Sequence, residues 1–158
     1  MSAGLYSRAV NWFSATKAGS FTVKHLAAKV DPWIYERTNG RFTITGKATV
    51  PQLTLFAVGR KSGEPRPVQL AYHQKGDDLF VVASAMGQQR HPAWRYNLEA
   101  HREVEVQLPG RRLAMIATLL APEEKSAMWA DIADTIPQMH VYVERTDRDI
   151  CVFRLSPA

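Results

Sequence analysis

The sequence predicts an α+β protein in which about six mainly antiparallel strands form a β-barrel with flanking helices. Short apolar or alternating segments of strand length follow one another from about residue 52, with turn signals between most of them. Strands and helices do not alternate regularly, which argues against a doubly wound parallel sheet. The 158 residues, 46% of them hydrophobic, suffice to bury the core of one structural domain without a disulfide or a metal.

The strands are predicted from their hydrophobic patterns. The clearest lies at 103–108, where Val104, Val106 and Leu108 alternate with polar residues. The sequence Pro109-Gly110 then indicates a turn into the next strand. The predicted strands cover 53–58, 68–73, 79–83, 103–108, 111–120 and 149–155.

Helices are predicted at 91–100 and 122–136, each opening near a proline, and along the N-terminal segment. In the second of these, Glu123 and Glu124 occupy the first turn, where acidic side chains oppose the helix dipole favourably. Apolar residues in the N-terminal segment recur at three- and four-residue steps. We therefore expect a helical segment over 1–45 and the barrel over 46–158, together as one structural domain.

Composition restricts the class and location of the protein. The net charge of +5 favours an anionic partner, such as nucleic acid, an acidic lipid surface or a phosphorylated cofactor. A lone Cys151 and the lack of a secretory signal or membrane-length apolar run predict a cytoplasmic protein. The N-terminal helices, with Trp12 and Phe13 beside basic residues, suit packing on the barrel, closure over a site, or peripheral association with the inner face of the plasma membrane.

Motifs for covalent, nucleotide or metal chemistry are missing from the sequence. No dinucleotide-binding or phosphate-loop glycine pattern occurs, Ser84 is not in a nucleophile elbow, and no histidine pair has zinc-helix spacing. We therefore predict no metal site. If the protein is an enzyme, a bound organic cofactor is expected to perform the difficult step.

Two segments are candidates for such a cofactor. Gly59-Arg-Lys-Ser-Gly-Glu-Pro-Arg66, the basic turn, gathers three cations between two strands and suits phosphate oxygens, or it is a solvated basic hairpin. Val81-Val-Ala-Ser-Ala-Met-Gly87 leads from a strand through small residues toward the helix that carries Trp94. Small residues let a flat ring approach the backbone, and Trp94 either covers that ring or fills the core.

The ordered set of these motifs resembles the deazaflavin-dependent nitroreductase family. It runs from Gly-Arg-Lys-Ser-Gly-x-x-Arg and Val-Val-Ala-Ser-x-x-Gly through Pro-x-Trp-x-x-Asn-Leu to Thr146-Asp-Arg148 and Leu155-Ser-Pro157, over about residues 35–157. These actinobacterial oxidoreductases have a split β-barrel (FMN-binding-like) fold and use coenzyme F-420. The resemblance implies that the cofactor's anionic tail lies on the basic turn and that its ring lies near the small-residue segment and the following helix. The implied cofactor-binding residues are Arg60, Lys61, Ser62, Gly63, Arg66, Val82, Ala83, Ser84, Ala85, Met86, Ala93, Trp94 and Asn97.

The acceptor site departs from the family pattern. Tyr142 alone matches one of the family's tyrosines there, Ile136 and Met139 replace two others, and His140 is a candidate proton donor. We name Tyr142 and His140 as candidate catalytic residues. We expect hydride transfer to a small hydrophobic or electrophilic acceptor (a quinone-like, unsaturated or nitro compound), without carrying over nitroimidazole reduction.

Alternatives remain at this point. The protein could bind FMN instead, or hold the deazaflavin without turnover, as a monomer or a homodimer. A basic nucleic-acid-binding barrel is less consistent with the sequence, because its aromatic residues do not interleave with basic ones on the strands, and we expect no nucleic-acid partner.

Overall fold

The computed structural model describes Arg37, residues 42–43 and 46–47, and residues 50–158. The chain divides into two compact units, residues 1–49 and residues 50–158. In the first, β1 (Phe42–Thr43) pairs antiparallel with β2 (Gly46–Lys47). Nearly all of the predicted helical segment 1–45, including the proposed membrane-facing helices, lies outside the described residues, and the predicted boundary at residue 45 stays a prediction.

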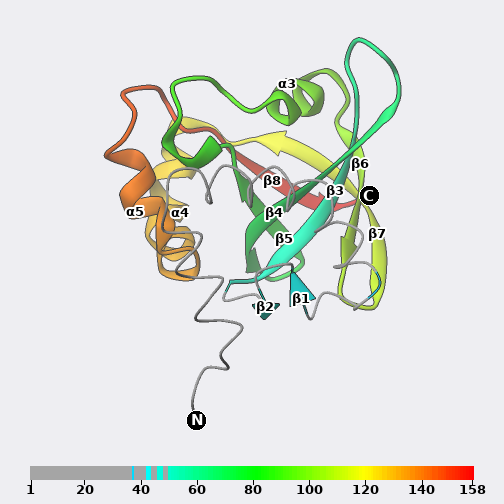
Figure 1. The fold of residues 1–158 in the computed structure, drawn as a ribbon, viewed down its shortest axis with the longest axis horizontal. Helices are drawn as coiled ribbons and strands as arrows, with labels where there is room; N and C mark the ends of the chain where they lie inside the picture. The colour runs from blue at the N-terminus through cyan, green and yellow to red at the C-terminus, as the bar shows by residue number, and fades with distance from the viewer. Residues whose placement is uncertain (1–36, 38–41, 44–45, 48–49) are drawn as a thin grey trace. The chain divides into compact units, whose positions relative to one another are not determined.

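Residues 50–158 form a closed antiparallel barrel of six strands, in the spatial order β3-β4-β5-β8-β7-β6, with β6 pairing back to β3 (Figure 1). This confirms the α+β barrel that the hydrophobic patterns predicted. The strands are β3 (Gln52–Val58), β4 (Pro65–Lys75), β5 (Asp78–Val82), β6 (Glu103–Leu108), β7 (Arg111–Leu119) and β8 (Val152–Pro157).

The barrel interior is filled by the inward-facing residues of alternating strands. Leu53, Leu55 and Ala57 of β3 are fully buried, and they belong to one apolar cluster with Val106 of β6 and Phe153 of β8. The three hairpins close in the register that alternation demands, at Val58↔Pro65, Lys75↔Asp78 and Leu108↔Arg111. Because alternate residues of strands such as β6 face the barrel interior, a shift of its register by one residue would turn its buried side chains outward.

Three helices and one short 3-10 turn complete this unit. They are η1 (Ala85–Gly87), α3 (Ala93–Ala100), α4 (Pro122–Thr135) and α5 (Gln138–Val143). Glu124 accepts a hydrogen bond from the Ala121 backbone N–H (3.3 Å), which satisfies one of the free donors at the start of α4. A second apolar cluster joins α4 and α5, through Ile132 and Met139, to Phe80 of β5. In Figure 1 these two helices lie together beside the barrel, and α3 lies apart from them.

One helix and the starts of two strands depart most from the sequence prediction. Helix α5 was not predicted, because six residues are too few for a helical period to be recognised. Strand β4 begins at Pro65 rather than residue 68, since its two prolines still pair with β3 through the hairpin register. Strand β8 begins at Val152 rather than residue 149, because residues 146–150 make loop contacts instead.

Within the described part of the chain, no helix is long and apolar enough to cross a membrane. Nor do the described residues include a cluster of three or more His, Cys, Asp or Glu side chains that could hold a metal ion.

Candidate cofactor site

The basic turn joins β3 to β4 and is closed by its own backbone. The Gly59 N–H donates to the Glu64 carbonyl and the Gly63 N–H donates to the Gly59 carbonyl, both at 2.8 Å. Gly63 has φ +70°, which favours glycine, and a Cβ on Gly59 would lie 2.6 Å from the Ser62 hydroxyl. The positive φ therefore favours glycine at position 63, and a side chain at position 59 would require the Ser62 hydroxyl to rotate away.

The three cations of the turn are available to an anion. The side chains of Arg60, Lys61 and Arg66 are exposed, and no ion pair among the described residues includes any of them. Arg66 donates one long hydrogen bond to the Ser62 hydroxyl (3.4 Å), and the Arg60 guanidinium lies 4.9 Å from the ring centroid of Tyr96. Three exposed cations on one wall of a pocket favour the anion-binding turn over the alternative of a solvated basic hairpin.

Helix α3 contacts the basic turn and holds its backbone in place. The buried Asn97 accepts a hydrogen bond from the Arg60 backbone N–H at 3.1 Å through its side-chain oxygen. The resemblance placed Asn97 near the ring, whereas the structure gives it a role in fixing the turn that carries the cations.

Turn and helix enclose an open pocket of about 640 Å³, which we call the tail pocket. One wall carries the three cations, and the opposite wall is formed by α3. Its lining residues are Gly59, Arg60, Lys61, Ser62, Arg66, Pro67, Val68, Ala93, Trp94, Tyr96 and Asn97.

A second pocket of about 380 Å³, the ring pocket, is bounded by β4, the segment containing η1, and α5. Its lining is mostly apolar, with four polar side chains: Gln69, Ser84, Gln138 and Tyr142. The full set is Val50, Gln69, Leu70, Ala71, Val82, Ser84, Ala85, Met86, Pro92, Trp94, Ile136, Gln138, Met139 and Tyr142.

Trp94 lines both pockets, so they adjoin at its side chain. It is also only 7% exposed and packs edge-on against Phe153 of β8, with ring centroids 5.9 Å apart. Trp94 is therefore a core residue, as one of the two alternatives held, and it also forms a wall of both pockets; that it covers a cofactor ring stays a prediction.

Comparison with known proteins identifies the family of the chain. Residues 27–157 match the family model described as F420H(2)-dependent quinone reductase. The chain belongs to this family. It is thus an oxidoreductase of the deazaflavin-dependent kind that the motifs indicated, and no finding supports the FMN alternative.

Individual relatives agree with the family match. An F420H(2)-dependent quinone reductase of Mycobacterium tuberculosis is 32% identical over 126 residues, covering 78% of this chain and 85% of that protein. A solved F420-H2 dependent reductase, FDR-A, superposes with a TM-score of 0.63 at 32% identity, covering 67% of this chain and 94% of its own. A solved structure described as a domain-swapped dimer superposes with a TM-score of 0.64 at 29% identity, covering 79% of this chain and 98% of its own.

Most of the predicted site residues of this quinone reductase family member line one of the two pockets. Tyr142 lines the ring pocket, whereas His140 is exposed and lines neither pocket. Gly63 belongs to the basic turn but does not line the tail pocket, and Ala83 is fully buried in the barrel core and lines neither pocket. The remaining predicted residues divide into Arg60, Lys61, Ser62, Arg66, Ala93, Trp94 and Asn97 in the tail pocket, and Val82, Ser84, Ala85, Met86 and again Trp94 in the ring pocket.

Gln69 of β4 is a lining residue that the sequence analysis missed. Its side-chain amide nitrogen is buried and has no hydrogen-bond partner among residues 50–158 or the few described residues before them. In the sequence Gln69 is one of the residues that alternate with the apolar Val68, Leu70 and Tyr72, a pattern that gives no sign of a pocket. A buried donor without a partner costs about 1–3 kcal/mol, and a bound oxygen would remove that cost. The polar and charged groups of both pockets thus fit an anionic, oxygen-bearing cofactor such as coenzyme F-420.

Proposed function

We propose that this protein binds reduced coenzyme F-420 across its two adjoining pockets and uses it to reduce a small, hydrophobic, quinone-like acceptor. The observation that carries this proposal is the junction at Trp94. There a pocket with three exposed cations, which form no ion pair with the residues that the structure describes, meets a pocket with mainly apolar walls. One end suits an anionic tail and the other a flat ring.

In the tail pocket, Arg60, Lys61 and Arg66 would bind the cofactor's phosphodiester and glutamyl carboxylates. Lysine offers a point charge and arginine a planar fork that grips two oxygens. The hydrogen bond from the Arg60 backbone to Asn97 keeps the turn against α3, which reduces the ordering cost of binding.

The ring pocket would hold the deazaflavin and place the acceptor against it. When bound, the reduced deazaflavin supplies the hydride; with one proton this converts a quinone to a hydroquinone. Ile136 and Met139, both buried, form an apolar wall that limits the entry of water. The Gln69 amide would donate a hydrogen bond to an oxygen of the ring or the acceptor, and the Tyr142 hydroxyl would hold the acceptor oxygen and supply the proton.

The proposal is tested by titration followed by turnover. The purified full-length chain is titrated with coenzyme F-420 and separately with FMN, following ring fluorescence, and then mixed anaerobically with reduced F-420 and menadione. We expect micromolar or tighter binding of F-420, much weaker binding of FMN, and menadione-dependent oxidation of the reduced cofactor. No binding of F-420 at micromolar concentration would refute the proposal; binding without turnover of any quinone would leave only the storage alternative.

The domain-swapped dimer among the structural neighbours favours the homodimer over the monomer, the two states predicted from the sequence. Light scattering during size-exclusion chromatography distinguishes the two.

A further inference from the structure

The segment that forms one wall of the ring pocket is held in a strained backbone conformation. Ala85 and Met86 have φ angles of 46° and 57°, and Gly87 follows with 76°. Left-handed geometry is unfavourable for residues with a Cβ, and it persists only where the surroundings enforce it. At Gly87 a Cβ would lie 2.7 Å from the Cβ of Arg145, so the third position has no room for a side chain.

The guanidinium of Arg148 binds the backbone on both sides of this left-handed turn. Before the turn, one terminal nitrogen donates to the carbonyls of Ser84 (2.6 Å) and Ala83 (3.0 Å). After the turn, Nε donates to the carbonyl of Gln88 (2.7 Å). Hydrogen bonds from a charged donor are the stronger kind, and three carbonyls converging on one planar group fix the turn between them.

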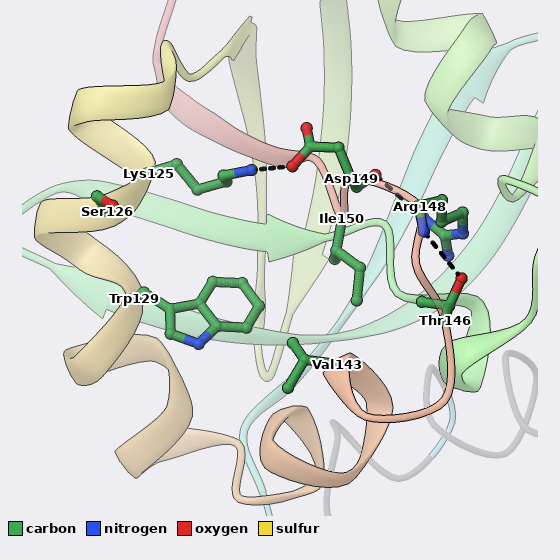
Figure 2. Close-up of a pocket in the computed structure, with 8 residues that line it drawn as sticks. All are labelled: Lys125, Ser126, Trp129, Val143, Thr146, Arg148, Asp149 and Ile150. Atoms are coloured by element: carbon green, nitrogen blue, oxygen red, sulfur yellow. Dashed lines mark hydrogen bonds and ion pairs between the residues drawn. The ribbon is translucent and has the colours of Figure 1, made fainter.

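Thr146, two residues before Arg148 in the chain, holds the backbone of Arg148 in place. Its backbone N–H donates to the Thr146 hydroxyl (3.3 Å), and that hydroxyl donates to the side-chain oxygen of Gln89 (3.1 Å). Figure 2 shows Thr146 and Arg148 on the loop before β8, at the edge of a pocket that the Lys125–Asp149 ion pair also lines. The loop between α5 and β8 is thus tied to the wall of the ring pocket.

Arg148 also contacts His91, a side chain that can gain a proton and become positively charged. The other terminal nitrogen lies 3.1 Å from Nδ1 of His91. Because the guanidinium has only donors, Nδ1 must accept, which assigns the proton of a neutral ring to Nε2. Burial, then the charges of Arg95 and Arg148, lower the pKa of His91, while Asp149 and Glu99 act in the opposite direction. The rings of Tyr96 and His91 pack edge to face, with their centroids 6.2 Å apart.

We propose that Arg148 is a positioning residue for the ring pocket: it holds the left-handed turn at Ala85–Gly87 in the shape that receives the deazaflavin ring, and it does so fully only while His91 is neutral. The identity of the ring rests on the proposed function. A protonated His91 would replace an acceptor with a donor and place a second positive charge against the guanidinium. Arg148 lines neither the tail pocket nor the ring pocket, so it acts through the backbone and not by contact with the cofactor.

The test measures the binding of the deazaflavin ring separately from that of the cofactor's tail. Dissociation constants are measured for coenzyme F-420 and for the deazaflavin chromophore without its phosphodiester tail, using Arg148→Met and Arg148→Lys. We expect Arg148→Met to raise both constants by a similar factor of about ten or more, as for loss of a charged hydrogen bond. Arg148→Lys should recover part of the lost affinity. Lys61→Ala should weaken the binding of coenzyme F-420, which has the tail, and leave the binding of the tail-less chromophore unchanged.

Arg102→Met is the matched control. That arginine also donates to a backbone carbonyl, of Ala117 at 3.1 Å, but it lines neither the tail pocket nor the ring pocket. Binding of the tail-less chromophore by Arg148→Met within about threefold of the Arg102→Met control would overturn the inference. If the wild-type chain binds neither ligand, the proposed function itself fails, which is a different result.

A pH series keeps the inference testable if Arg148→Met does not fold. Because the pKa of His91 is lowered, wild-type affinity for the chromophore should fall only as the pH drops below the ordinary imidazole value of about 6.5 and His91 gains a proton. His91→Asn keeps an acceptor without a titrating group, so its affinity should fall less over the same range. Identical profiles for the two proteins would contradict the role of His91, and with it the pH-sensitive half of the proposal.

Discussion

Replacing Arg66 by alanine should weaken the binding of coenzyme F-420 and leave the fold intact. The Arg66 side chain is exposed, and the hydrogen bond found for its guanidinium is the long one to the Ser62 hydroxyl, at 3.4 Å. Removing it leaves no buried charge or donor without a partner. The free energy of unfolding should therefore change by no more than ~0.5 kcal/mol, the range of an ordinary surface substitution.

The loss of affinity follows from the bond that the tail would make. A hydrogen bond between charged groups contributes about 1.5–3 kcal/mol, so losing one raises Kd by about 10- to 150-fold. The tail pocket is open to solvent, which favours the lower end of this range. Because the Debye length falls from ~10 Å at 0.1 M salt to ~3 Å at 1 M, the difference between wild type and variant should narrow in high salt.

The assay is a fluorescence titration of F-420 at both salt concentrations, with urea unfolding to verify the fold. Lys75→Ala removes an equal charge as a control, since Lys75 is exposed, pairs with Asp131 of α4 and lines neither the tail pocket nor the ring pocket. The reasoning is refuted if Arg66→Ala binds F-420 like wild type, or if Lys75→Ala weakens binding equally.

Four other substitutions or probes test the rest of the site. Trp94→Ala should lower the free energy of unfolding by about 3–5 kcal/mol in urea, as for a large buried aromatic, and also weaken F-420; a stable variant would show that Trp94 is only a pocket wall. Gln69→Leu should leave the cofactor-free protein equally stable or up to ~1 kcal/mol more stable, because it removes a buried unpaired donor, while raising the Kd for F-420 or the KM for menadione; lower stability would mean that the amide has a partner in the fold. Since the folded-state pKa of His91 is lowered, its stabilising contribution is complete above its unfolded pKa of about 6.5 and is lost as pH falls toward the folded value; urea midpoints should show this acid slope reduced in His91→Asn. Burial raises the pKa of the Cys151 thiol, so iodoacetamide should modify it at least about tenfold more slowly in the native than in the unfolded chain, and equal rates would show that the thiol is accessible.

Local features of this protein were predictable because they depend on neighbours in the chain. Alternation of apolar residues located β6 within its true bounds, and the glycines of the basic turn marked the β3–β4 connection. Pro122 with two acidic residues after it marked the start of α4. In each case the signal and the structure lie within a few residues, where periodicity and turn chemistry operate.

Contacts between distant residues were not predictable in the same way. Asn97 lies 37 positions from the turn whose backbone it holds, and Arg148 lies 64 positions from the Ser84 carbonyl to which it donates. Neither residue type reveals its partner, since amides and guanidinium groups serve equally well on a solvated surface. The resemblance still brought both segments to attention, without saying what their polar groups contact.

The sequence by itself determined the class of the fold, the position of the basic turn and the family, because hydrophobic periodicity and ordered motifs are properties of the linear chain. The tertiary structure decided which side chains share a pocket. It joined the charged and apolar pockets at Trp94, directed Gln69 into a pocket rather than to solvent, left His140 outside, and placed Arg148 across a strained turn. Such outcomes depend on barrel closure and on helices packing against its strands, which no local pattern of residues encodes.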